Sequence, residues 1–206
     1  GFDHAKKILA GKCSGAVLTA LCDTSPTCLA RVKEDLKEYD LAYFENYEDL
    51  FASKLIDAVI VAVPHFDHAK IAISAFAHGL HVMSEKPAGA YTRQVREMNE
   101  AADRSGKKFG MMFQQRVYPA YRKIREIVHS GQMGEIRRTN WLVNDWYRSQ
   151  VYYDSGSWRA TWAGEGGGVL LNQCPHNLDL WQWICGMPNK VRAFCHIGKW
   201  HDIEVE

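Results

Sequence analysis

Two short segments of the chain carry side chains suited to proton transfer and charge stabilisation. Lys86 lies in the segment Glu85–Pro87, directly after an apolar run of strand length. A lysine at a strand end can hydrogen-bond a substrate oxygen and stabilise its developing charge, although a solvated turn lysine has the same local sequence. His176 follows Asn172 by four residues and precedes Asp179 by three, which puts the three side chains on one face of a continuous helix.

His176 has two interpretations. An imidazole held between polar partners keeps one tautomer and acts as a general base. Pro175 weakens the assumption of an unbroken helix, although proline is tolerated in a first helical turn. The alternative is a histidine that fills a polar seam in the packing and does no chemistry.

The first apolar run, Ala16–Cys22, ends on Asp23, a position that suits recognition of a dinucleotide. In a Rossmann unit an acid about 20 residues past the glycine turn binds the adenosine ribose hydroxyls, and Gly1 can be the last glycine of that turn. Thr24 and Ser25 bring no arginine to neutralise a 2′-phosphate, which favours NAD over NADP. The alternative is an aspartate that caps the next helix.

The β-branched run Ala58–Val63 has the pattern of a buried parallel strand. Open α/β sheets bind ligands in the crevice at the carboxyl ends of such strands. His65 and His68 also form an H-x-x-H pair, but a metal site needs further convergent ligands, so we predict loop and cap histidines and no metal. The candidate cofactor contacts at these strand ends are Val63, Pro64, His65, His68, Glu85 and Lys86.

The stretch Asp145–Gly168 is predicted as an aromatic, polar loop. Its tryptophan and arginine side chains can stack on sugar faces and donate to hydroxyls or carboxylates. A packed loop or an oligomer-interface loop would have the same composition. The candidate substrate contacts are Arg148, Trp158 and Arg159, together with Asn172 and His176.

The elements that must position these residues alternate between strand and helix. Such alternation predicts βαβ units in an α/β fold, a doubly wound Rossmann sheet with parallel strands. We expect strands at Ala16–Cys22, Ala42–Phe44, Ala58–Val63, His81–Ser84 and Phe109–Phe113, and helices at His4–Ala10, Pro26–Tyr39, Tyr47–Ser53, Asp67–His78 and Thr92–Ser105.

The pattern changes near residue 117, where we place a domain boundary. Residues 1–117 are predicted to form the dinucleotide-binding Rossmann domain, and residues 118–206 part of a second, α+β domain. In this second part we expect a longer strand at Glu135–Asn144, a helix near Gln173–Cys185 and a strand at Lys190–His196.

The composition is that of a globular protein of one or two domains, with 206 residues, 47% of them hydrophobic and 24% charged. A net charge of +1 provides no bulk field for nucleic acids or acidic membranes, and the longest apolar stretch, Ala58–Pro64, is too short to span a membrane. The six cysteines form no C-x-x-C pair. Because Cys22 and Cys185 lie in apolar segments, where free thiols are buried, a reducing cytoplasm is favoured.

The chain opens on Gly1 and closes on Asp202–Glu206, which alternates like a strand. In the doubly wound order the first strand is central, and without it two apolar strands lack a partner, at about 1–3 kcal/mol for each unsatisfied buried group. We therefore expect a longer protein, with its first strand before Gly1 and further sheet strands after Glu206.

Five segments, in this order, resemble the Gfo/Idh/MocA oxidoreductases, a family that includes glucose-fructose oxidoreductase and inositol dehydrogenases. They are Gly1–Ala5, Val63-Pro64 with His68, Glu85–Pro87, Gly131 with Gly134–Ile136, and Gly166–Gly168 with His176 and Asp179. The resemblance spans nearly the whole chain. It implies an NAD(P)-binding Rossmann domain and a second domain whose open, mainly antiparallel sheet often forms an oligomer interface. We accordingly expect a homodimer or homotetramer.

By the same resemblance Lys86 matches the family's catalytic lysine and His176 its catalytic histidine. Asn172 stands where many members have an aspartate, and since an amide cannot take a proton, we interpret Asn172 as orienting substrate or histidine. The favoured hypothesis is NAD-dependent hydride transfer at a hydroxyl or carbonyl carbon of a sugar, cyclitol or related polyol. The alternatives are an NAD-retaining glycosidase of the same fold and a non-catalytic dinucleotide-binding transcriptional regulator.

Overall fold

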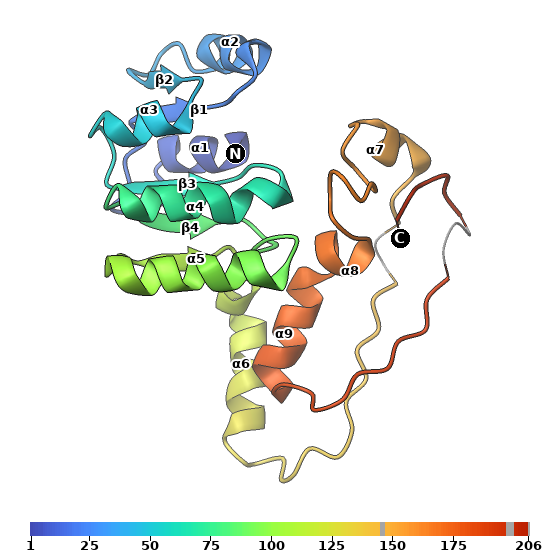
Figure 1. Cartoon of the computed structure of the whole chain (residues 1–206). Coiled ribbons are helices and arrows are strands. Elements are labelled where there is room, and N and C mark those ends of the chain that lie inside the picture. The colour runs from blue at the N-terminus through green and yellow to red at the C-terminus, as the bar shows by residue number, and fades with distance from the viewer. Residues whose placement is uncertain (145–146, 197–199, 206) are drawn as a thin grey trace. The chain divides into compact units, whose positions relative to one another are not determined.

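The computed structural model describes residues 1–144, 147–196 and 200–205 (Figure 1). The chain divides into two compact units, of which the first is Gly1–Val63 with Asp67–Met111 and the second is Pro64–Phe66 with Met112–Glu206. The domain boundary near residue 117 stays a prediction from sequence. Each unit is described by itself.

The first unit is built on parallel strands. β3 (Ala58–Val61), β4 (His81–Ser84) and β5 (Phe109–Met111) form a three-stranded sheet in that order, and β1 (Ala20–Cys22) pairs with β2 (Ala42–Phe44). All three strand pairs are parallel, as a chain that alternates strands with helices requires. The predicted α/β fold is confirmed, but the first strand is shorter than expected because the run before it is exposed, with Val17 at 84%.

Five helices belong to this unit: α1 (Phe2–Leu9), α2 (Pro26–Asp35), α3 (Tyr47–Ala52), α4 (His68–Ala77) and α5 (Thr92–Ser105). Side-chain caps fix two of their starts, since Ser25 accepts from the backbone N–H of Cys28 and Asn46 from that of Glu48. Gly106, at φ 64°, ends α5 in the left-handed region, where only glycine is unstrained.

The core of the first unit lies between its helices and the three-stranded sheet. α4 contacts β3, β4 and α5, and Figure 1 shows α4 and α5 running alongside each other. Its alanines Ala69, Ala72 and Ala75 are buried, and such small side chains let the helix approach the sheet closely. Val61 and Val82 from the strands complete the packing. Burial of this apolar surface fixes where the strand ends, and hence the loops after them, must lie.

The second unit is helical in the part that the structure describes. It contains a 3₁₀ turn η2 (Gln114–Val117) and the helices α6 (Pro119–His129), α7 (Gln150–Asp154), α8 (Val169–Asn172) and α9 (Pro175–Cys185). α6 and α9 pack together. Near the end of α9, Arg125 donates to the carbonyl of Trp183, and Nε2 of His129 lies 3.1 Å from the carbonyl oxygen of Ile184. No described helix of the chain has the length and apolarity to cross a membrane.

Two strand expectations for the second unit are wrong. Glu135–Asn144 and Lys190–His196 form no strand among the described residues, because neither segment finds a ladder partner and both are mostly exposed. The helix expected near Gln173–Cys185 is confirmed as α9, which begins at Pro175, but it does not continue back to Asn172, since proline provides no N–H to the turn before it. Asn172 therefore ends a separate short helix, α8.

Candidate active site

The carboxyl ends of β3 and β4 leave the sheet at the same level. Val61 is paired with Ser84 in the parallel register, and the backbone N–H of Glu85 donates to the carbonyl of Val61 at 2.9 Å. The loop that begins with Val63 and the turn that holds Lys86 consequently start side by side. This is the edge of a parallel sheet at which open α/β proteins bind ligands.

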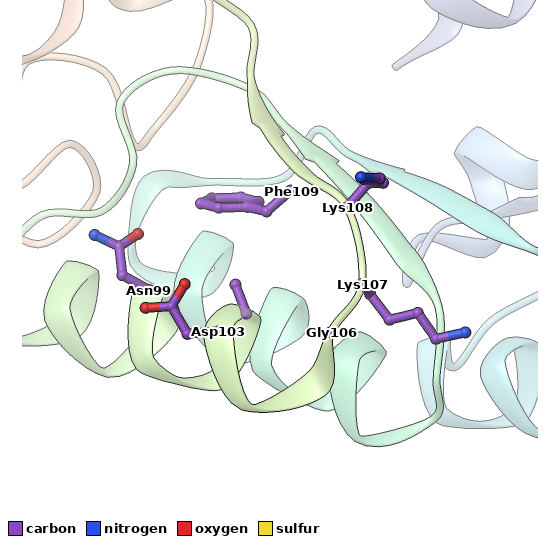
Figure 2. A pocket seen from close by; sticks show the side chains of 7 residues that line it. Asn99, Asp103, Gly106, Lys107, Lys108 and Phe109 are labelled. Atoms are coloured by element: carbon purple, nitrogen blue, oxygen red, sulfur yellow. The ribbon is translucent and has the colours of Figure 1, made fainter.

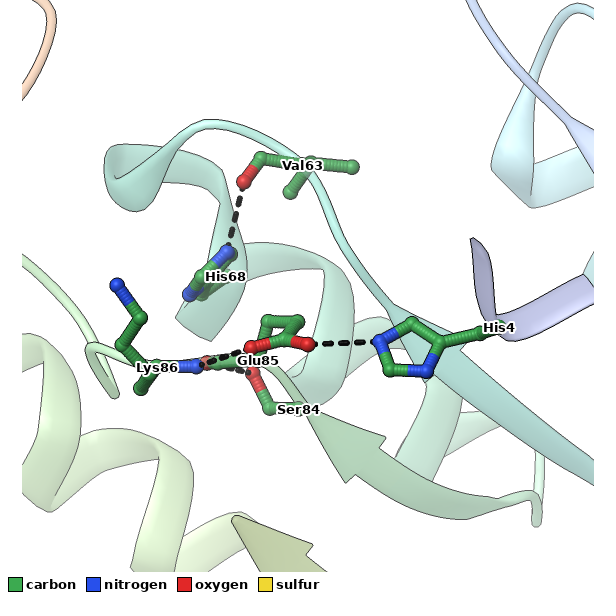
Figure 3. Close-up of polar contacts among 6 residues, drawn as sticks. All are labelled: His4, Val63, His68, Ser84, Glu85 and Lys86. Atoms are coloured by element: carbon green, nitrogen blue, oxygen red, sulfur yellow. Dashed lines mark hydrogen bonds and ion pairs between the residues drawn. The ribbon is translucent and has the colours of Figure 1, made fainter. Parts of the chain in front are cut away.

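His68 joins these two loops. Its Nε2 lies 2.7 Å from the Val63 carbonyl oxygen and its Nδ1 lies 2.6 Å from that of Pro87. His68 is the first residue of α4, and it is 1% exposed. Carbonyls only accept, so each contact is a hydrogen bond when its ring nitrogen carries a proton. His68 thus ties the loop after β3 to the turn after β4, and Figure 3 shows its contact with the Val63 carbonyl.

Glu85 holds the Lys86 turn from its other side. Figure 3 shows its carboxylate between the His4 ring and the Lys86 backbone, with Oε1 2.7 Å from His4 Nε2 and Oε2 accepting from the Lys86 N–H at 3.2 Å. His4 belongs to α1, so a helix distant in sequence from β4 takes part in fixing this turn. Lys86 itself is half-buried and precedes a cis-proline. Its backbone is held by contacts on both sides.

Gly1 and Asp23 are the remaining predicted cofactor positions of the first unit. Gly1 caps α1, and a Cβ built on it would lie 3.9 Å from that of Ala62, so the start of the helix lies beside the end of β3. Helix starts favour phosphate groups because their N–H groups point outward. Asp23 is exposed just after β1, where one carboxylate oxygen accepts from the Ser25 N–H at 2.8 Å. Asp23 does not cap α2, whose N-cap is Ser25, and it instead closes a turn just before the helix.

A surface hollow of about 530 Å³ lies elsewhere on this unit. Figure 2 shows it between the end of α5 and the start of β5, lined by residues that include Asn99, Asp103, Lys107 and Phe109. Phe109 is the first residue of β5, so the hollow lies at the amino end of the sheet. Ligands of open α/β sheets bind at the carboxyl end, and the hollow is therefore not the candidate site.

In the second unit, Asp179 does not lie where a partner of His176 was expected. Its carboxylate is bound by both sides of the Arg116 guanidinium, with Nε–Oδ2 at 2.7 Å and Nη2–Oδ1 at 2.5 Å. The Asp179 side chain is only 7% exposed, so the arginine compensates a buried charge. His176 stacks edge-on against Phe113, with ring centroids 6.0 Å apart. The three side chains predicted on one helical face have separate partners.

Asn172 is bound to a residue that sequence reasoning did not select. Its Nδ2 donates to a carboxylate oxygen of Glu165, and the two residues are 7% and 3% exposed. The backbone carbonyl of Glu165 in turn lies 2.9 Å from Nδ1 of His65. The ring of His65 also packs edge-on against Trp158. His65, predicted as a cofactor contact, is thus a buried side chain within the second unit.

The predicted substrate contacts Arg148 and Arg159 meet at one aromatic ring. Both guanidinium carbons lie 4.5 Å from the centroid of Tyr152, and Arg159 donates to the Tyr152 hydroxyl at 2.7 Å. Arg159 also stacks on Trp158 at 4.7 Å. These stacked cations form a compact arginine–aromatic cluster in the second unit.

Sequence reasoning missed His4, Arg116 and Glu165. A histidine in the first turn of a helix, an arginine in a turn after a strand, and a glutamate before three glycines are each common surface features. The partner of His4 lies 81 residues away in the chain and that of Arg116 lies 63 residues away, so these two contacts could not be found from neighbouring residues. The partner of Glu165 lies only 7 residues away. A charged residue directly before the glycine run was the one local signal available.

The cysteine side chains and the possible metal ligands of the described residues form no further candidate site. All six cysteines are free, and Cys185 is exposed, contrary to the burial expected from its apolar neighbours. Burial raises the pKa of the Cys22 thiol to about 11, with the charges of Asp23 and Asp49 as lesser causes. Within residues 1–144, 147–196 and 200–205, no group of three or more histidine, cysteine or acidic side chains could hold a metal ion.

Comparison with known proteins identifies both units. Residues 1–113 match the model of the GFO/IDH/MocA oxidoreductase family with an NAD-binding Rossmann fold, and residues 121–206 match the GFO/IDH/MocA C-terminal domain. An inositol 2-dehydrogenase of Corynebacterium glutamicum is 30% identical over 189 residues, covering 90% of this chain and 51% of that protein. An uncharacterised oxidoreductase of Synechocystis is 29% identical, covering 80% of this chain and 44% of its own length. The chain spans about half the length of these curated relatives.

Two solved structures are similar in fold. The WlbA dehydrogenase of Chromobacterium violaceum, in complex with NADH and UDP-GlcNAcA, superimposes with a TM-score of 0.85 at 27% identity, covering 99% of this chain and 57% of that one. A scyllo-inositol dehydrogenase of Lactobacillus casei, with NAD(H) and scyllo-inositol bound, gives a TM-score of 0.70 at 26% identity, covering 89% and 52%. The chain belongs to the GFO/IDH/MocA family of oxidoreductases, with an NAD-binding Rossmann fold in its first part.

Proposed function

We propose that this protein is an NAD-dependent dehydrogenase that acts on a hydroxyl or carbonyl carbon of a sugar, cyclitol or related polyol. The observation that carries the proposal is the way the Lys86 turn is held, by His4 through Glu85 and by His68 through Pro87, at the carboxyl end of β4. The turn that carries a side chain must be fixed in this way if that side chain is to reach one particular substrate oxygen and stabilise its charge. Named relatives that bind inositol or a nucleotide sugar support the substrate class.

The proposed roles divide between the units. Bound NAD would supply the hydride acceptor. The residues to hold it are Gly1 at the start of α1, Asp23 after β1, and the strand-end residues Val63, Pro64, His68, Glu85 and Lys86. Lys86 hydrogen-bonds the reacting oxygen, and His176 takes the hydroxyl proton on a ring nitrogen. Arg148, Trp158 and Arg159 bind further parts of the substrate.

The test is a screen for NADH formation by the purified protein, with sugars and inositols as substrates and NAD or NADP as the oxidant. Lys86→Met should abolish turnover, whereas NADH binding, followed by fluorescence titration, should weaken by no more than several-fold because the other proposed cofactor contacts remain. Lys70→Met is the matched control, since Lys70 is an exposed lysine of α4 in the same unit. Turnover by Lys86→Met at the rate of the wild type would overturn the assignment.

Two other results would identify the alternatives. Release of free sugar from a glycoside without net NADH formation indicates the glycosidase. Tight NADH binding without turnover of any compound in the panel indicates the regulator. A homodimer or homotetramer, proposed from the family resemblance, is tested by light scattering, and the proposed cytoplasmic location by fractionation.

A further inference from the structure

Glu165 is a buried acid that the proposed reaction does not use. The residue is 3% exposed, and one of its carboxylate oxygens accepts from the Asn172 side chain. Its backbone carbonyl binds His65 Nδ1 at 2.9 Å. A carboxylate removed from water costs free energy unless donors compensate it, so a side chain in this position is expected to have a task.

The pairing decides which way the Asn172 amide points. A carboxylate only accepts hydrogen bonds, so the Nδ2 end of the amide must face Glu165. The other end, Oδ1, is an acceptor and is turned away from the carboxylate. With a neutral apolar neighbour either orientation of the amide would be allowed, and the site would present a donor as readily as an acceptor.

Asn172 lies next to the proposed chemistry in the chain. It is the last residue of α8, and its backbone N–H donates to the Gly168 carbonyl at 3.1 Å. His176, the proposed base, follows four residues later in the first turn of α9. A cavity of about 220 Å³ in the second unit is lined by Glu165 and Asn172 together, with Tyr153, Gln173 and His201 among its other walls. A ligand group in this space meets the amide that Glu165 orients.

We propose that Glu165 is a positioning residue that orients the Asn172 amide so that Oδ1 accepts a hydrogen bond from a substrate hydroxyl. The inference rests on the proposed function, because it assumes a polyol substrate. It specifies the subsite further: the ligand group there must be a donor, such as a hydroxyl, and not a carboxylate or a carbonyl. The carboxylate of Glu165 sets this orientation, because an acceptor-only group excludes the amide orientation in which Oδ1 of Asn172 would face it.

Exchanging the amide of residue 172 and the carboxylate of residue 165 tests the proposal. Asn172→Asp places a second carboxylate against Glu165, so kcat/KM should fall about tenfold or more from repulsion and lost orientation. Adding Glu165→Gln lets the introduced amide donate to the introduced carboxylate, which then offers its other oxygen as the acceptor. The double variant should regain kcat/KM to within a few-fold of the wild type. Glu135→Gln removes an exposed carboxylate of the same unit and is the matched control.

Glu165→Gln alone distinguishes positioning from a structural role. Its side chain has the same shape and can still pair with Asn172, but in either amide orientation, so KM should rise several-fold with little change in thermal unfolding. Replacing the substrate by the analogue that lacks the bound hydroxyl should cancel this difference. A double variant that recovers stability but not kcat/KM, or an Asn172→Asp variant as active as the wild type, overturns the proposal.

A second readout needs no turnover. In Asn172→Asp two adjacent carboxylates share a proton, so its melting temperature should rise relative to the wild type as the pH is lowered, and the double variant should lose this dependence. Absence of that signature overturns the pairing itself. Failure of the wild type to oxidise any polyol while the signature is present overturns the proposed function and, with it, the hydroxyl assignment, but leaves the carboxylate–amide pair established.

Discussion

Removal of the His68 imidazole should destabilise the first unit by about 3–5 kcal/mol. The ring is 1% exposed and contacts the carbonyl oxygens of Pro87 and Val63 at 2.6 and 2.7 Å. In His68→Ala the buried Pro87 carbonyl loses its partner, at about 1–3 kcal/mol, and the part-buried Val63 carbonyl adds about 1 kcal/mol because water reaches it more easily. The cavity left by the ring adds about 1 kcal/mol more.

Urea unfolding followed by two signals measures this loss. All 7 tryptophans lie at or after position 141, so tryptophan fluorescence reports only on the second unit, whereas far-UV circular dichroism includes the first. We expect the circular dichroism transition of His68→Ala to move to lower urea, and the melting temperature that it reports to fall by roughly 15–20 °C. His68→Gln retains a donor for one carbonyl and should lie between the alanine variant and the wild type.

His78→Ala is the control, because His78 is exposed at the end of the same helix and its polar contacts are with the Ser74 carbonyl and the Glu48 carboxylate. It should cost less than about 1 kcal/mol. If His68→Ala unfolds at the same urea concentration as the wild type, or if His78→Ala loses as much, the two carbonyl contacts do not hold the loops and the reasoning fails.

Two further substitutions and the shifted pKa of Cys22 have defined outcomes. Arg116→Ala leaves the 7% exposed Asp179 carboxylate without its guanidinium and should cost about 2–4 kcal/mol in tryptophan-detected unfolding, whereas Arg137→Ala, from an exposed pair, should be nearly neutral. Lys54→Gly removes a side chain from a residue at φ 58° and should stabilise the first unit by about 0.5–1 kcal/mol, measured by urea unfolding. Burial raises the Cys22 pKa from 9.0 to about 11, so at pH 8 its alkylation, followed by mass spectrometry, should be about a hundredfold slower than that of an unshifted thiol. In the unfolded chain the thiol ionises at the lower pKa of 9.0, so the free energy of unfolding should fall as the pH rises from 9 towards 11.

The parallel part of the fold was predictable because its strands are short apolar runs between turn residues. His81–Ser84 and Ala42–Phe44 are observed with the predicted bounds. Ala16–Cys22 was overextended, because an apolar run shows hydrophobicity but not burial, and Val17 is exposed. The strands expected at Glu135–Asn144 and Lys190–His196 depended on partners, and pairing is a tertiary property that a local pattern does not contain.

The site was predictable residue by residue but not contact by contact. Sequence reasoning selected Lys86, His176 and Asn172 from their types and spacing, and their roles stay proposals. It assumed that Asp179 would face His176, yet an arginine from a distant turn binds Asp179, because a buried carboxylate pairs with the nearest cation that the fold brings to it. Such pairings depend on where separate elements pack, which spacing along one helix cannot show.

The pairing of Val61 with Ser84 constrains how this chain can change over evolutionary time. A side chain in a strand alternates faces at every residue, and each residue advances the strand by about 3.3 Å. Conservative substitutions in β3 or β4 leave the height of Lys86 above the sheet unchanged. A single inserted or deleted residue in β4 would shift that lysine by a full step and turn it to the opposite face. Length variation among relatives should therefore be excluded from the two strands and confined to the connections at the amino end of the sheet, where the hollow beside Phe109 lies.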